Sequence, residues 1–177
     1  MRRAFLALLI CLSLPLAALA EARPRGLLWS ATPLPRTFPL QVKSTPGTDY
    51  LLTLRDAETG AGVLAAYVRG GSFFRVLVPP GRFRVDLAAG RPDDWRDEVA
   101  RFGPGTEDLR VDAVLEFRVI GTARRAGHIL DLRGPARLVA VPFDLCERLA
   151  LAPDSLEPAP GELFARPRFD RISRACG

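Results

Sequence analysis

L-R-V-D-A-V-L-E-F-R-V, residues 109–119, is the stretch of the chain that decides the fold class. Its apolar side chains recur at every second position, and most of the positions between them carry charged residues. Successive side chains of a β-strand point to opposite faces of a sheet. The period of two therefore predicts a strand with one buried face.

The same alternation extends outward from this stretch, back to Phe38 and on to Arg133. Short alternating runs are separated by turn signals such as Gly70-Gly71 and the Pro-Pro-Gly at 79–81. Short, closely spaced strands with such turns are typical of antiparallel sandwiches and barrels. We predict an all-β domain over residues 38–142, an antiparallel β-sandwich of about seven to eight strands.

Residues 1–20 have the pattern of a cleavable secretory signal. Arg2 and Arg3 precede an uncharged apolar run that ends in A-L-A at 18–20. A membrane-spanning helix needs about 20 apolar residues, which is more than this run provides. We therefore expect cleavage before Glu21 and a location outside the cytoplasm, either periplasmic or secreted. No transmembrane segment is expected after cleavage.

Two further segments flank the predicted sandwich. Residues 21–37 contain three prolines and are predicted to be a linker without regular structure. Residues 143–177 are predicted to be a C-terminal extension with a short, partly helical tail. The run from Asp144 to Glu147 resembles a helix N-terminus, and later prolines limit its length.

The cysteines fit the predicted compartment. Cys11 leaves with the signal, so Cys146 and Cys176 form an even pair. A disulfide between them is the favoured interpretation in an oxidising space, and two unpaired thiols are the alternative.

The overall charge is mild. The chain has 25 basic and 20 acidic residues, and the loss of Arg2 and Arg3 with the signal lowers the excess from +5 to +3. Acids and arginines are interleaved, as on a solvated surface. A basic stretch, Arg166 to Arg174, has apolar residues between its arginines, and we expect it to lie across the sandwich. The alternative is an electrostatic contact with anionic lipid head groups or an acidic partner. No nucleic-acid partner is predicted, because that would require a concentrated basic face.

Residues 89–108 form the longest break between predicted strands, and Trp95 and Phe102 stand out in it. Loops often carry binding residues, so these two side chains are a possible interaction surface. The alternative, which large aromatic side chains favour, is that they fold inward and close one end of the sandwich.

No residues form a recognisable catalytic or metal-binding set. His128 is the only histidine, and Asp131, three residues on, projects from the opposite strand face. The acids at 93, 94, 97 and 98 are interspersed with arginines, which favours a salt-bridged loop over a calcium site or a carboxylate-based hydrolase. We predict no metal and no cofactor.

Three stretches resemble a group of small bacterial exported domains of unknown function and, more loosely, carboxypeptidase-regulatory-like or transthyretin-like β-sandwiches. They are Y-L-L-T-L-R-D-A-E-T-G at 50–60, Y-V-R-G-G at 67–71 leading to V-P-P-G at 78–81, and Trp95 followed by F-G-P-G-T at 102–106. The resemblance covers about residues 38–133. It implies a module that supports, binds or displays, and it supplies no catalytic residues.

The leading functional hypothesis is a non-catalytic exported module with a structural or protein-interaction role in the cell envelope. The alternative is a binding protein for a small or polymeric envelope ligand, a glycan or peptidoglycan fragment, through the 89–108 loop. The identity of the partner and the oligomeric state stay open.

Overall fold

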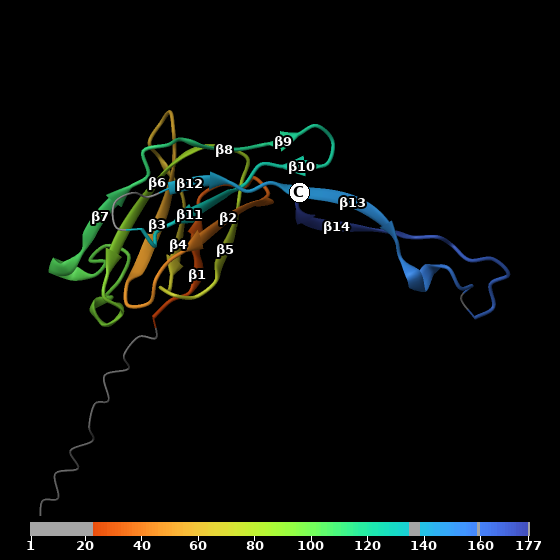
Figure 1. The fold of residues 1–177 in the computed structure, drawn as a ribbon, viewed down its shortest axis with the longest axis horizontal. Helices are drawn as coiled ribbons and strands as arrows, with labels where there is room; N and C mark the ends of the chain where they lie inside the picture. Colours follow the sequence, from red (N-terminus) through yellow and green to blue (C-terminus); the bar gives the residue numbers. More distant parts are fainter. Residues whose placement is uncertain (1–22, 135–138, 159, 177) are drawn as a thin grey trace, which may run out of the picture.

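The computed structural model describes residues 23–134, 139–158 and 160–176, and the predicted signal lies outside them. The described chain is all-β and contains fourteen strands in three sheets, with only three short 3₁₀ turns (Figure 1). The all-β prediction is confirmed. The expected number of strands is too low, because the sequence between and beyond the predicted strands also pairs.

The largest sheet has six strands, all antiparallel to their neighbours. Its order is β1-β4-β3-β6-β7, and β8 also pairs with β6. The bounds are β1 Gly26–Ser30, β3 Asp49–Asp56, β4 Gly62–Val68, β6 Gly81–Gly90, β7 Glu107–Arg110 and β8 Leu115–Phe117.

The second sheet has four strands in the order β12-β11-β2-β5. The bounds are β2 Phe38–Lys43, β5 Phe74–Val78, β11 His128–Asp131 and β12 Val139–Pro142. Its pairs are antiparallel except for β11 and β2, which run parallel. This parallel pair departs from the purely antiparallel arrangement that we predicted.

One hydrophobic core joins these two sheets, which together form the body of the molecule. Along β3, Tyr50, Leu52 and Leu54 point into this core, and along β2 Phe38, Leu40 and Val42 do so from the other sheet. Burial of alternate apolar side chains from both sheets is the main stabilising contribution, at about 25 cal/mol per Å² of apolar surface.

The stretch at 109–119 behaves as an interrupted strand. β7 and β8 pair with the same edge of β6, from Arg110 opposite Asp86 to Leu115 opposite Phe83. From Arg110 to Leu115 the chain advances five positions, whereas from Asp86 to Phe83 its partner β6 advances three. Two extra residues therefore form a bulge between β7 and β8. Because two is an even number, the inward face is kept on both sides of the bulge. Val111, Leu115 and Phe117 are buried in the core, as predicted, while Ala113 is exposed. The prediction of a single long strand over 109–119 is wrong.

The linker prediction for 21–37 is wrong in part. β1 lies within this range and pairs with β4, with a register shift between Leu27 and Trp29. The prolines at 24 and 33 lie just outside the strand, where they interrupt no ladder hydrogen bond.

The tail is not helical, contrary to our prediction. β13 (Leu145–Leu151) and β14 (Phe169–Ala175) form an antiparallel pair over seven residues each, and among the described residues between them the only helical turn is Pro153–Ser155. A complete set of seven partners on β14 outweighs the helix-start signal at Asp144.

These two strands belong to a third sheet, ordered β14-β13-β10-β9, with β9 Val119–Ile120 and β10 Arg124–Arg125. Figure 1 shows β13 and β14 extending away from the body, with the C-terminus returning to the base of the pair. We call residues 145–176 the arm.

Candidate interaction surfaces

Trp95 and Phe102 pack on the outer face of the six-stranded sheet. The ring centroid of Trp95 is 4.5 Å from that of Tyr67 and 5.3 Å from that of Phe102, in edge-on geometry. Phe102 is 1% exposed, and Trp95 is half-buried. The pair therefore folds inward, and Phe102 offers no contact area to a partner, which corrects its placement in a possible interaction surface.

The sequence around these rings explains why they fit. Gly90 at the end of β6 lies against the Phe102 ring, and a Cβ at this position would collide with that ring. The Trp95 ring also packs against a small apolar cluster on the outer sheet face, formed by Leu51, Ala65 and Ala88. The 89–108 loop thus covers part of the sheet.

Asp49, the first residue of β3, is a buried acid on the same sheet face as Leu51, and it is 2% exposed. Its carboxylate accepts hydrogen bonds from the Tyr67 hydroxyl at 2.9 Å and the Gly70 amide at 2.8 Å, and Arg23 pairs with it at 3.1 Å. Burial and the hydrogen bond to the Asp49 carboxylate raise the pKa of the Tyr67 hydroxyl. The carboxylate is fully engaged in holding the β3–β4 region, which is a structural role.

Beside the rings, the outer face of β3, β6 and β7 carries an open groove of about 550 Å³. Its floor includes Leu51 and Ala88, and residues 98, 99 and 101 of the loop form one wall. Charged side chains line the rest: Asp86 lies between Arg110 at 2.7 Å and Arg55 at 2.9 Å. Burial raises the pKa of Asp86, but the two arginines outweigh it and lower that pKa overall.

The other sequence candidates are engaged in local contacts. The His128 ring packs edge-on against Phe117 at 4.9 Å, and its Nε2 lies 3.0 Å from the Glu116 carbonyl oxygen. In the acidic loop, Asp97 accepts hydrogen bonds from two backbone amides, and Glu98 accepts one from the Trp29 indole. These contacts are made by backbone amides and an indole, and within the described residues none of the four loop acids pairs with an arginine, so the expected salt bridges of this loop are not formed.

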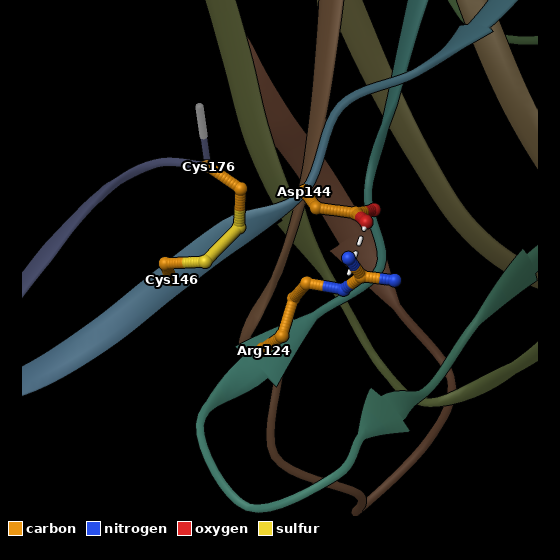
Figure 2. Close-up of a disulfide and its surroundings, with 4 residues drawn as sticks. All are labelled: Arg124, Asp144, Cys146 and Cys176. Carbon is orange, nitrogen blue, oxygen red and sulfur yellow. Dashed lines mark ion pairs between the residues drawn. A yellow bond between two sulfur atoms is a disulfide. The ribbon is translucent and has the colours of Figure 1, made fainter.

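Cys146 and Cys176 form a disulfide at the base of the arm (Figure 2). Their Cα atoms are 5.1 Å apart, within the range that a disulfide requires. Two arginines of β10 hold the same base: Arg124 pairs with Asp144 at 3.2 Å and Arg125 with Glu147 at 2.8 Å. The base of the arm is therefore tied both to itself and to the body.

Beyond its base, the arm exposes an unusual amount of apolar surface. Seven of the fourteen exposed large apolar side chains in the described residues belong to it: Leu149, Leu151, Leu156, Leu163, Phe164, Phe169 and Ile172. Gathered exposed apolar side chains mark interaction surfaces. Our expectation that the Arg166–Arg174 stretch lies across the sandwich is wrong, since every residue of β14 is exposed.

Sequence reasoning missed Leu149 and Leu151 because it interpreted this segment as a helix start. The segment L-C-E-R-L-A-L at 145–151 does not alternate strictly, because its apolar residues stand at 145, 146 and 149–151. Its strand depends on pairing with β14, which is distant in sequence.

Within the ranges that the structure describes, no helix is long and apolar enough to cross a membrane, and no three His, Cys, Asp or Glu side chains are grouped to hold a metal ion. Comparisons with protein-family models, with curated proteins and with solved structures found no match. The resemblance to transthyretin-like sandwiches stays a prediction.

Proposed function

We propose that this chain is an exported, non-catalytic β-sandwich module of the cell envelope that contacts another protein through the arm. The observation that carries the proposal is the arm itself. It leaves the body, is clamped at its base by a disulfide and two ion pairs, and exposes apolar side chains along its length. A segment that is held in position but left uncovered is suited to binding a partner.

Two features support an extracytoplasmic location. The intramolecular disulfide is typical of proteins that fold in an oxidising compartment. The signal-like pattern of residues 1–20 indicates how the chain would reach it. Mass spectrometry of the exported protein should find Glu21 as the first residue, and an intact Met1 would contradict this part of the proposal.

The placement of the reactive side chains supports a non-catalytic role. Asp131, the acid closest in sequence to His128, is held by Arg133 through two side-chain hydrogen bonds of 2.8 and 2.6 Å. Asp49, the buried acid, is used to anchor a turn and a tyrosine. A general base needs a proton-bearing group of the substrate within its reach, and these acids are committed to other partners.

Site-specific photo-crosslinking in the cells that produce the protein tests this function. A photoreactive residue at Leu149 or Phe164 should give adducts to a protein of discrete mass, because both side chains are exposed on the arm. The matched control is Phe73, which is 73% exposed on the body. Equal labelling at Phe73 and on the arm, or none on the arm, would contradict the proposal.

The groove on the six-stranded sheet favours a second candidate, binding of a glycan or peptidoglycan fragment. It has an apolar floor, opposed charges on its walls, and one wall formed by the 89–108 loop. Such a mixed lining is usual in small-molecule sites. Titration with cell-wall fragments should shift the NMR signals of Thr53 and Ala88, and Thr53→Trp, which fills the groove, should abolish the shifts. Shifts that persist in this variant would exclude the groove.

A further inference from the structure

The outer edge of β14 is the most open backbone edge of the arm. β14 is the last strand of its sheet, it pairs only with β13 among the described strands, and all seven of its residues are exposed. An edge strand of this kind presents unpaired N–H and C=O groups to another chain. Addition of a strand to such an edge is a recurrent mode of protein recognition.

The sequence of β14 is complementary to itself. In F-D-R-I-S-R-A, residues 169–175, Asp170 and Arg174 stand two positions on either side of Ile172, and Phe169 and Ala175 stand three positions away. Two copies that pair antiparallel around Ile172 place Asp170 opposite the partner's Arg174 and Phe169 opposite the partner's Ala175. Two opposite-charge pairs and three apolar pairs therefore form at once.

We propose that the arm's partner is a second copy of this chain, bound through an antiparallel β14–β14 pairing centred on Ile172. This inference rests on the proposed function of the arm. The two-fold arrangement is isologous, so each copy uses the same surface and the pairing closes as a dimer. It joins the two β13–β14 pairs into one continuous four-stranded sheet.

The faces of the arm agree with this register. Asp170, Ile172 and Arg174 lie opposite Ala150, Arg148 and Cys146 of β13, so they share one face. Ala150 and Cys146, directly opposite Asp170 and Arg174, carry no charge, while Arg148 lies opposite Ile172. Arg174 has no ion pair within the described part of the chain, and Asp170 has one exposed contact, with Arg168 at 3.5 Å.

Neighbouring symmetric registers lack this complementarity. Because side chains alternate between faces, a two-fold pairing must be centred on a residue. A centre at Arg171 places that arginine opposite its own copy, and a centre at Ser173 places Asp170 opposite the partner's Cys176. Of these three registers, the one centred on Ile172 pairs the opposite charges.

Sedimentation equilibrium of the exported, disulfide-bonded chain tests the proposal. A seven-residue strand pairing is smaller than a standard interface, so we expect a weak dimer, with a dissociation constant of about 10–100 μM. Asp170→Arg and Arg174→Asp each place like charges opposite one another at two positions and should weaken dimerisation about tenfold or more.

The decisive measurement mixes the two variants. An equimolar mixture of Asp170→Arg and Arg174→Asp places opposite charges together again and should dimerise as well as the wild type. The double variant, Asp170→Arg with Arg174→Asp, should do so alone. Both positions are exposed, so the variants should keep the circular dichroism spectrum of the wild type.

A wild type that stays monomeric up to about 500 μM would overturn the dimer. Dimerisation that is unchanged in the two single variants would overturn it too, because the contact would then lie elsewhere. In either case crosslinks from Leu149 and Phe164 to a different protein would still support the interaction role, so the two proposals fail separately.

Discussion

The body and the arm are both built from paired strands and differ in what covers them. In β3, Leu52 and Leu54 are fully buried between two sheets. In β13, Leu149 and Leu151 are likewise two positions apart, yet they are 67% and 40% exposed. The spacing of leucines along a strand therefore does not decide their burial, which depends on whether a second layer exists.

The two regions consequently depend on different forces. The body is stabilised by burial of apolar surface from two sheets. A two-stranded hairpin has no such core and is marginal in water. The arm instead relies on a disulfide, two ion pairs at its base and the ladder between β13 and β14.

The largest expected contrast comes from one substitution made in both regions. Phe117→Ala removes a side chain that is 1% exposed and whose ring centroid lies 6.0 Å from that of Phe83. This substitution should therefore lower the free energy of unfolding by about 3–5 kcal/mol. Phe164→Ala, at 80% exposure, should change it by less than about 0.5 kcal/mol. Urea unfolding followed by circular dichroism measures both, and similar costs would contradict the division into body and arm.

Removal of one acid from each region should give the next largest contrast. Asp49→Ala leaves the buried Tyr67 hydroxyl and the Gly70 amide without their acceptor, at a cost of about 2–4 kcal/mol. Asp154→Ala breaks an exposed pair with Arg168 and should leave stability almost unchanged. The same urea titration compares them; a neutral Asp49 variant would mean that water satisfies these donors.

Sequence reasoning predicts the body well because its inward face is specified locally. The period of two identifies the buried residues on both sides of the bulge between β7 and β8, but it misses the bulge and places inward Val119, which is 54% exposed. Two extra residues keep the pattern in phase, so the sequence carries no break in rhythm to reveal them. β1 is missed for a different reason, since the prolines around it argue against any strand.

The arm was harder to predict, because its features depend on contacts distant in sequence. The cysteine pair follows from compartment and count, but its position at the base of a hairpin requires β13 and β14 to be in register. Similarly, Trp95 and Phe102 have the same sequence character whether they face solvent or pack on Tyr67. Only the position of the outer sheet face decides between these alternatives.

Removal of the disulfide should raise the rate of proteolysis in the arm and leave the body nearly unchanged. A bridge that closes a loop of this length stabilises by about 3–4 kcal/mol in the chain-entropy model. Because the closed loop lies within the arm, Cys146→Ser with Cys176→Ser should speed trypsin cleavage at Arg148 and Arg171 about tenfold or more. The urea midpoint of the body should hardly change. A body that unfolds with the arm would show that the two form one cooperative unit.

The smallest expected effect is a pH dependence confined to the body. Asp86 has its pKa lowered in the folded protein by hydrogen bonds from Arg110 and Arg55, which outweigh the opposing effect of burial. A carboxyl whose folded pKa lies below its unfolded value of 3.8 adds stability above that pH and loses it as the pH falls toward the folded value. Between pH 6 and pH 2 the wild type should therefore lose about 0.5–1 kcal/mol more unfolding free energy than Asp86→Asn, since both arginines are exposed enough to weaken the pairs. Urea titrations of the two proteins across this pH range measure the difference. The contributions of the other acids are the same in both proteins and cancel in this difference. Identical pH profiles would show that the Arg55–Asp86–Arg110 row is screened by solvent as fully as the exposed pairs of the arm.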